Sequence, residues 1–513
     1  MNFKRKLWWA QHKNDVYKYG TILSLVLIVT ISIIYFTYSK FSSTNEMTMY
    51  ETTVEPFIKN DYFIASYIDG EWSNEIPGKN DGYIIDKVVC DNGATGTWDY
   101  NDWEIRISNA TKKTKCSLFF VTGSLIDVEL YQGLIPVTYN SSGDVVVADT
   151  STKWYDYSNH EWANAVLVNC ADSAIKSKYF NGDMSLKSSV VGKTISMDEI
   201  LQMYVYIPRY RYKLFNANNG TSKEQAIDII FEKISTDKSN GTENGEWLTH
   251  PAFTFGNTEL PGIWVGKFES SNTSSLPKIV PNASSIRNIN VSTQFNSSRL
   301  ITTTLTSTYG TSTNSNSHMM KNVEWGAVAF LTNSIYGRYN SNSSCIDSGC
   351  EVWINNNSNF ITGCAGSSSN ASSSTTCNAW NTSIGIKAST TGNIYGIYDM
   401  SGGAWEYVMG NYNDTVGSSG FTTLPSTKYY DKYSGSGFTM YHLGDATKET
   451  IKEISGINAS WYNDESRAFY SSAPWVARGG YYINGSGGGI FHFSGNDGSG
   501  NVYASFRSVL TAN

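Results

Sequence analysis

The stretch NIYGIYDMSGGAWEYV at residues 393–408 decides the fold of the C-terminal part of the chain. Gly396, Gly402 and Gly403 suit tight turns that need a positive φ. Trp405 supplies a large aromatic side chain for a core. These positions therefore describe a scaffold, and we assign catalysis to none of them.

Four further segments stand on either side of this stretch: IWVGKFE at 263–269, VEWGAVAFL at 323–331, ARGGY at 477–481 and SFRSVL at 505–510. Apolar residues at helical spacing predict a helix over 323–331. The segment MYVYIPRYRYKLF, which starts at Met203, alternates with period two and predicts a strand. Arg478 and Arg507 are expected to be held by buried polar partners. The Ser/Thr/Asn-rich stretches 270–317 and 340–391 are predicted to be long loops inserted in this domain.

In this order, the five segments resemble the formylglycine-generating-enzyme (sulfatase-modifying factor) family, whose fold is a variant of the C-type lectin fold. The resemblance covers about Met203 to the C-terminus. It implies a domain of that fold over 197–513. Asp399 could equally serve a structural calcium site like that of the family, and no other cofactor is expected.

The enzymes of this family carry a pair of reactive cysteines just after the RGG segment, which bind copper and activate oxygen. Here that region reads RGGYYINGSGGGIFHFSGNDGSGNVYASFRSVL and contains no cysteine. Without a thiolate there is neither the soft copper ligand nor the nucleophile. The related iron-dependent sulfoxide synthases need a histidine cluster, and only His492 is present. We therefore expect the fold without the enzyme activity.

The C-terminal segment between Gly480 and Phe506 has a composition that suits binding. Tyr, Ser, Gly and Asn combine rigid aromatic contact area with adaptable hydrogen bonding, as in antibody loops. The alternative is a Gly-rich loop with a few core aromatics. The candidate ligand-binding residues are Tyr481, Tyr482, Asn484, Ser486, Phe491, His492, Phe493, Asn496, Asp497 and Tyr503.

The resemblance extends to the target proteins of diversity-generating retroelements. These are C-type-lectin-like relatives whose C-terminal binding surface is varied by adenine-directed mutagenesis. In them, a terminal strand containing FR closes a segment in which Asn-type codons become Tyr, Ser, Asp, His, Phe or Gly. The residue types at 481–503 are those that such conversion would produce.

Composition excludes several classes of protein. The 513 residues carry 38 Lys and Arg against 45 Asp and Glu, and the net charge of −7 argues against a nucleic-acid partner. The aromatic content of 14% is too high for a disordered chain. We therefore expect a folded chain with at least one large core.

Residues 21–39, TILSLVLIVTISIIYFTYS, carry no charge and have close to the ~20 residues that a helix needs to cross a membrane. Five cations precede this segment, Lys4, Arg5, Lys6, Lys13 and Lys18, and only Lys40 follows closely. The positive-inside rule then predicts a cytoplasmic tail at 1–20 and the bulk of the chain outside the cell. The alternative is a cleaved signal peptide, which needs a shorter apolar core and an A-x-A-like site.

All seven cysteines follow this segment, on the side where disulfides persist. Their positions suggest the pairs Cys90–Cys116, Cys345–Cys350 and Cys364–Cys377, which leaves Cys170 free or intermolecular. The alternative is that these are small buried residues. Zinc binding is disfavoured because no C-x-x-C or H-x-x-x-H spacing occurs.

The predicted fold class is thus α+β, with a single transmembrane helix at 21–39, a stalk at 40–61, β-rich modules at 62–121 and 122–196, and the C-terminal domain. We expect a single-pass membrane protein whose head recognises an extracellular protein or glycan. The first alternative is a structural surface or phage-tail-like assembly protein. The second is an oxygen-dependent sulfatase-modifying enzyme.

Overall fold

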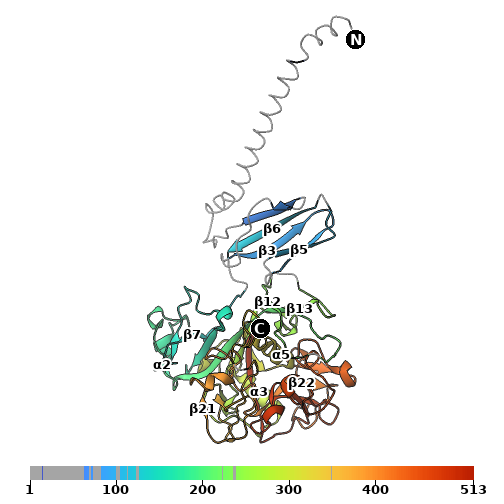
Figure 1. Cartoon of the computed structure of the whole chain (residues 1–513). Coiled ribbons are helices and arrows are strands. Elements are labelled where there is room, and N and C mark those ends of the chain that lie inside the picture. Colours follow the sequence, from blue (N-terminus) through green and yellow to red (C-terminus); the bar gives the residue numbers. More distant parts are fainter. Residues whose placement is uncertain are drawn as a thin grey trace. The chain divides into compact units, whose positions relative to one another are not determined.

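A computed structural model of the chain describes residue 14 and residues 63–68, 71–72, 83–99, 104–111, 114–122, 126–221, 223–234, 238–347 and 349–512. The chain divides into two compact units, Met1–Leu125 and Ile126–Asn513 (Figure 1). Strands make up 31% of the structure and helices 15%. The predicted α+β class is therefore wrong, because short strands and loops, rather than helices, make up most of the part of the chain that the structure describes.

The predicted transmembrane helix is not supported. Within the described ranges, no helix is long and apolar enough to cross a membrane. The predicted segment itself, 21–39, lies outside the described residues, as do the predicted stalk at 40–61 and all but one residue of the predicted tail at 1–20.

The N-terminal unit is built on a four-stranded antiparallel sheet in the order β2-β1-β6-β3. A separate hairpin joins β4 and β5. Cys90 pairs directly with Cys116 between β3 and β6, where the two residues form a disulfide. The strands are β1 (Phe63–Ile68), β2 (Glu71–Trp72), β3 (Tyr83–Cys90), β4 (Thr95–Asp99), β5 (Glu104–Ser108) and β6 (Lys115–Thr122).

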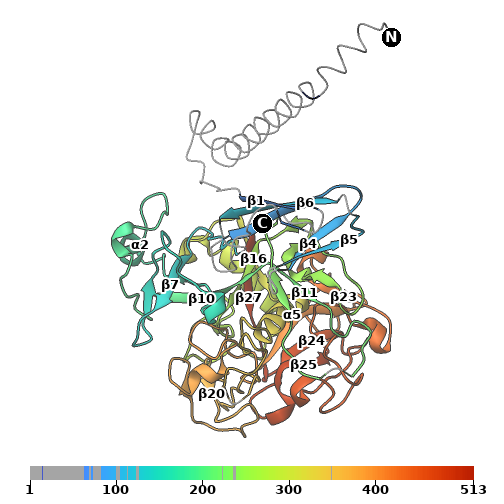
Figure 2. The same ribbon diagram turned by 45° about the horizontal axis from the view of Figure 1, so that its top comes forward.

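The C-terminal unit contains a seven-stranded sheet in the order β19-β27-β16-β10-β9-β7-β8. Figure 2 shows β7, β10, β16 and β27 following one another across this unit. The strands are β7 (Ile135–Tyr139), β8 (Val145–Val147), β9 (Asn164–Val168), β10 (Ile200–Pro208), β16 (Gly262–Gly266), β19 (Ser315–Met319) and β27 (Ser508–Ala512).

This sheet changes the predicted domain boundary. The sequence analysis separated a module at 122–196 from the domain at 197–513. In the structure β9 pairs with β10 along most of its length, with Met203 opposite Val166. The strands on either side of the predicted boundary therefore belong to one sheet, because pairing between distant strands leaves no local signal in the sequence.

A second, five-stranded sheet lies in the same unit. Its order is β23-β22-β24-β25, and β26 pairs with β22 in parallel. The strands are β22 (Trp405–Tyr412), β23 (Asp431–Tyr433), β24 (Trp475–Gly479), β25 (Gly489–Asn496) and β26 (Ala504–Phe506). A core cluster connects α3 (Val291–Arg299) with this sheet through Phe295, Tyr407 and Phe506.

Short sheets and helices complete the unit. The small sheets contain β11 (Tyr210–Lys213), β12 (Ile229–Phe231) and β13 (Trp247–Thr249), the pairs β14 (Thr254–Phe255) with β15 (Thr258–Glu259) and β17 (Ser271–Thr273) with β18 (Leu276–Lys278), and β20 (Cys364–Ala365) with β21 (Asn378–Ala379). The other α-helices are α2 (Ser173–Tyr179), α4 (Thr306–Tyr309) and α5 (Asn322–Thr332). The 3₁₀ helices are η1 (Tyr157–Asn159), η2 (Ser188–Val190), η3 (Pro251–Phe253), η4 (Leu300–Thr302), η5 (Gly385–Ala388), η6 (Thr427–Tyr429), η7 (Gly437–Met440), η8 (Trp461–Asn463) and η9 (Gly485–Gly487).

Two predicted elements are confirmed. The helix predicted over 323–331 is α5, which is buried along its whole length. Its Trp325 indole donates to the carbonyl of Ile490 at 2.7 Å and so ties the helix to β25. The predicted strand from Met203 is present as β10 and β11, interrupted at Arg209.

Arg507 lies where the chain passes from β26 in one sheet to β27 in the other. Its guanidinium is fully buried and contacts both carboxylate oxygens of Glu406. It also donates to the carbonyls of Gly266 at 2.7 Å and Tyr398 at 2.9 Å. The predicted role of Arg507, a cation held by buried polar partners, is confirmed.

Replacing Arg507 with methionine should destabilise the protein by about 3–5 kcal/mol, because the substitution leaves the Glu406 carboxylate buried without its partner. Denaturant unfolding of the full chain measures this change. The matched control is Arg467→Met, since Arg467 pairs with Glu465 while 65% of its side chain is exposed. That change should cost about 1 kcal/mol or less. Equal losses for the two variants would contradict the structural role of Arg507.

Candidate functional site

An aromatic surface forms where the predicted C-terminal segment meets two distant parts of the C-terminal unit. We call it the aromatic platform and define it as Phe360, Trp405, Tyr481, Tyr482 and Tyr503. The ring centroids of Trp405 and Tyr481 are 4.7 Å apart, those of Tyr481 and Tyr503 are 5.0 Å apart, and those of Phe360 and Tyr482 are 4.9 Å apart. Edge-on and tilted contacts at these distances are favourable for aromatic rings and hold them in place.

Two glycine-containing turns bring these rings together. Gly403 precedes Trp405 and Gly480 precedes Tyr481, and both have a positive φ. A Cβ atom on Gly403 would lie 2.4 Å from a carboxylate oxygen of Glu269, and one on Gly480 would lie 2.6 Å from the Cα of Gly488. The turn geometry predicted for Gly402 and Gly403 is confirmed. These turns fix the places at which the rings leave the sheet.

Backbone hydrogen bonds join the two turns. The N–H of Tyr482 donates to the carbonyl of Gly403 at 3.0 Å, and the N–H of Trp405 donates to the carbonyl of Tyr503 at 2.8 Å. The Asn484 side chain accepts from the N–H of Tyr481 at 2.8 Å. These bonds hold the segments around Trp405, Tyr481 and Tyr503 together, although they are distant in sequence.

Arg287 borders the platform. Its guanidinium carbon lies 3.8 Å from the ring centroid of Phe360, and it donates to the carbonyl of Val502. Burial lowers the pKa of Arg287, and the nearby Glu269 raises it. A cation stacked on an aromatic ring stiffens that ring and adds positive charge to the edge of the surface.

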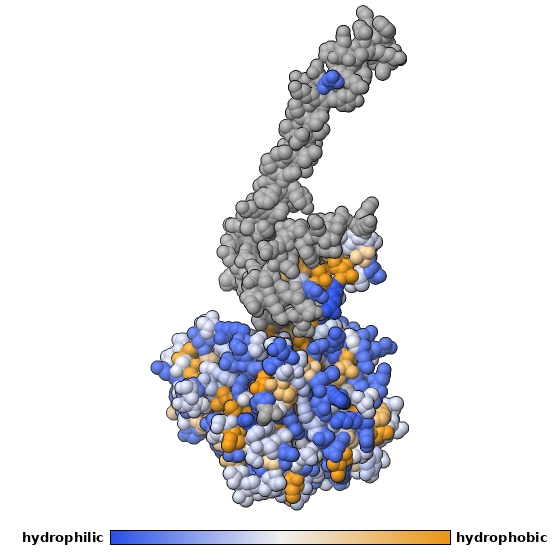
Figure 3. Space-filling view, viewed as in Figure 1, coloured by the Kyte–Doolittle hydropathy of each residue, from blue (hydrophilic) through white to orange (hydrophobic). Residues whose placement is uncertain are grey.

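The platform is open to solvent on one side. Tyr503 is 40% exposed, whereas Trp405, Tyr481 and Tyr482 are half-buried and Phe360 is buried beneath them. Val502 and Ile483, which adjoin Tyr503 and Tyr482 in the sequence, are 48% and 55% exposed. On the face of the molecule seen in Figure 3, hydrophobic side chains are scattered among hydrophilic ones. Scattered apolar residues are ordinary at a protein surface, so the packing of rings on one another is the feature that marks this site.

The structure separates the ten predicted ligand-binding residues into four groups: three in the platform, two beside it, two at the end of β25 and three buried within β25. Tyr481, Tyr482 and Tyr503 are in the platform. Asn484 follows the turn after Tyr482, and Ser486 lies in the adjoining η9. Asn496 and Asp497 are half-buried at the far end of β25. The Asn496 side chain accepts from the Tyr407 hydroxyl, and that of Asp497 accepts from Ser499, so these two contact the protein itself.

Phe491, His492 and Phe493 are buried in β25, and their assignment to the ligand surface is wrong. Phe491 packs edge-on against Trp461 at 5.3 Å, and Phe493 packs against Tyr441 at 5.4 Å. Burial lowers the pKa of His492 to about 4, so its imidazole is neutral. Both faces of this strand are covered, which the sequence alone did not indicate.

Sequence reasoning missed Phe360 and Arg287. Its assignment of Trp405 to the core is confirmed in part, since the half-buried Trp405 packs against the core cluster of the five-stranded sheet. Phe360 stands in a polar loop more than a hundred residues before Tyr481, with a φ of 55°. An aromatic residue with this backbone conformation is strained, and such residues gather at functional sites. No local pattern in the sequence marks it.

The carboxylate of Asp399, which we considered as a calcium ligand, already accepts hydrogen bonds from the protein. Its carboxylate accepts from the N–H of Gly363 at 2.9 Å and from the Asn355 side chain at 2.8 Å. Burial raises its pKa, and Arg507 lowers it. In the part of the chain that the structure describes, no group of three or more His, Cys, Asp or Glu residues could hold a metal ion.

Arg478, the second arginine predicted to have buried polar partners, has a different environment from Arg507. It donates to the carbonyl of Ile490 at 3.4 Å, and its guanidinium carbon lies 5.5 Å from the Trp325 ring and 5.8 Å from the Phe493 ring. Burial lowers its pKa to about 10. Aromatic faces thus supply much of its environment.

Compared with models of known families and with curated proteins, the sequence matches none of them. The resemblance to the formylglycine-generating enzymes therefore stays a prediction.

The predicted disulfides are confirmed. Cys90–Cys116, Cys345–Cys350 and Cys364–Cys377 are bonded, and Cys170 is free and buried. Burial raises the pKa of the Cys170 thiol to about 11, so it carries no thiolate near neutral pH.

Thiol labelling with N-ethylmaleimide should therefore depend on unfolding. The native, unreduced chain should add no label, because Cys170 is buried and protonated. The denatured, unreduced chain should add one label, on Cys170. The denatured chain with its disulfides reduced should add seven labels. The mass of the intact protein measures the number of labels. Two or more labels on the denatured, unreduced chain would mean that one of the three pairs is open.

Proposed function

We propose that the C-terminal unit is a binding domain that recognises a protein or glycan through the aromatic platform. The observation that carries this proposal is the set of packed rings, held by two glycine turns and open on one side. Rigid aromatic side chains give contact area at low entropic cost, because little rotamer freedom remains to be lost on binding. Aromatic residues also dominate the energy of many binding surfaces.

Two buried donors, one in the platform and one at its border, are left without a partner. The Nε of Arg287 and the indole N–H of Trp405 are buried and have no hydrogen-bond partner within the described residues. Buried donors are normally satisfied by protein, water or ligand. Because protein covers both atoms, an acceptor on a bound protein or glycan would reach them only if the side chains over them move.

The state of the cysteines also favours binding over oxygen-dependent catalysis. Six cysteines are in disulfides, and the seventh has a raised pKa. A thiolate that could hold copper is therefore lacking in the C-terminal unit as described. We propose that the protein acts outside the cytoplasm, where the three disulfides persist.

Replacing Tyr481 or Tyr503 with alanine should weaken ligand binding about 30-fold, the loss typical of a central aromatic contact. A glycan array and a displayed peptide library, both probed with the full chain, would select binders for titration. The control is Tyr470→Ala, because Tyr470 is 55% exposed and lies outside the platform.

Binders that tolerate both platform substitutions would contradict this role. So would a chain that binds nothing on the array or in the library and forms ordered oligomers in sedimentation experiments. That second result would favour the structural assembly protein.

If the C-terminal segment is diversified, natural variation should follow exposure. Deep sequencing of the last codons in a natural population should show substitutions at Tyr481, Tyr482 and Tyr503. Codons 491–493 should stay constant because their side chains are core. The segment encoding 393–408 serves as the internal control. Equal variation at 491–493 would contradict the assignment of the platform, and an invariant tail would mean a fixed ligand.

A further inference from the structure

A polar cavity lies in the C-terminal unit, lined by residues that do not belong to the aromatic platform. Its volume is about 590 Å³, within the range of small-molecule sites. Its walls are the hairpin of β14 and β15, the start of α5, and the chain from η6 into β23. The lining residues used below are Asn257, Lys321, Thr427, Lys428, Asp431 and His442.

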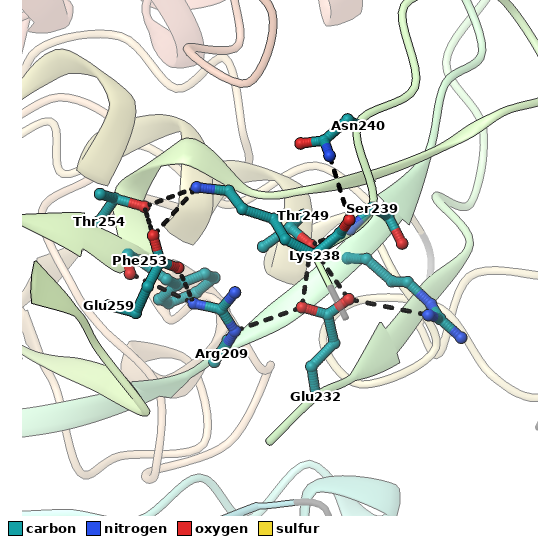
Figure 4. A network of polar contacts seen from close by, with 10 residues as sticks. Arg209, Glu232, Lys238, Ser239, Asn240, Thr249, Phe253, Thr254 and Glu259 are labelled. Carbon is teal, nitrogen blue, oxygen red and sulfur yellow. Dashed lines mark hydrogen bonds and ion pairs between the residues drawn. The ribbon is translucent and has the colours of Figure 1, made fainter. Parts of the chain in front are cut away.

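One wall of this cavity is held rigidly. Arg209 is buried and ion-pairs with Glu259 at 2.7 Å and with Glu232 at 3.3 Å (Figure 4). The hydroxyl of Thr254 donates to Glu259 at 2.8 Å, which ties the two strands of the hairpin to Arg209. Thr254 itself lines the cavity. The hairpin is therefore preorganised before any ligand arrives.

The acidic group in the lining is already neutralised. Asp431 pairs with Lys321 at 3.1 Å, and its other oxygen accepts from the N–H of Val323 at 2.9 Å. Burial raises the pKa of Asp431, while Lys321 lowers it. Because Lys321 and the first turn of α5 satisfy this carboxylate, it exerts little repulsion on an anion in the cavity.

Lys428 is the lysine of the cavity lining whose charge is not paired with a described carboxylate. Its Nζ lies 5.1 Å from the ring centroids of both Phe255 and Tyr429. Within the described residues, no carboxylate lies at ion-pair distance from it, whereas the neighbouring Lys432 is paired with Asp414. A half-buried ammonium held over aromatic faces keeps its donors available for an anionic oxygen.

Neutral polar groups surround this cation. Asn257, Thr427 and His442 are exposed lining residues with amide, hydroxyl and imidazole groups. We propose that the cavity binds a saccharide bearing one carboxylate, with the carboxylate on Lys428 and the sugar hydroxyls on these neutral groups. A single uncompensated cation matches a singly charged ligand better than a phosphate or sulfate dianion.

Ligand-observed NMR titration of the full chain with D-glucuronate, D-glucose and inorganic sulfate tests this proposal. Glucuronate should bind, glucose should bind at least about tenfold more weakly, and sulfate should not displace glucuronate at equal concentration. Lys428→Gln should weaken glucuronate binding by at least about tenfold, and Lys428→Arg should retain it. The control Lys193→Gln removes an exposed lysine outside the cavity and should have no effect.

Thr427→Ala provides a second variant that alters the exposed lining and leaves the core unchanged, so it tests the site even if Lys428→Gln unfolds. It should weaken glucuronate binding. Sulfate that competes as well as glucuronate would overturn the saccharide assignment and leave a simple anion site. Absence of glucuronate binding, or equal binding by Lys428→Gln, would overturn the site itself. None of these outcomes depends on the aromatic platform.

Discussion

The buried guanidinium of Arg507 is the interaction on which the C-terminal unit depends. It connects β22 through Glu406, β16 through the Gly266 carbonyl, and the loop before β22 through the Tyr398 carbonyl. A buried charge is tolerated only when it is paired and its donors are satisfied. These contacts tie the two sheets together at the point where the chain passes from β26 to β27, next to the strand that begins at Trp405.

A second buried basic side chain holds the other end of the segment 393–408. Lys267 is fully buried and donates at 2.9 Å to the Asn164 side chain and at the same distance to the Gly396 carbonyl. Burial lowers its pKa well below the usual value. The positive φ expected for Gly396 is wrong. Glycine is needed there because a Cβ would lie 2.3 Å from the Ser389 hydroxyl. With both ends fixed, this segment holds Trp405, its one residue in the platform, in place.

The C-terminal segment shows how far composition can locate a binding surface. The enrichment in Tyr, Asn, Ser and Gly falls on the part of the chain that contributes three tyrosines to the platform, and its role in binding stays a prediction. It did not separate Tyr481 from Phe491, because both residue types occur in cores and in binding loops. The difference is that β25 is covered on both faces, whereas the turn after Gly480 leaves the sheet. Which face is covered depends on η8 and on α5, far away in the sequence.

The sequence by itself determined the features that depend on neighbouring residues: helix α5, the strands β10 and β11, the turns at Gly402 and Gly403, and the three disulfides. These follow from hydrophobic periodicity, backbone sterics and the pairing of cysteines that are consecutive in the sequence once Cys170 is set aside, at separations of 26, 5 and 13 residues. Only the tertiary structure decided that 126–196 shares a sheet with the rest of the unit, that Phe360 and Arg287 join the tyrosines, and that Lys428 faces a cavity. These features arise from pairing between distant segments, and no local pattern encodes which distant residue will be the partner.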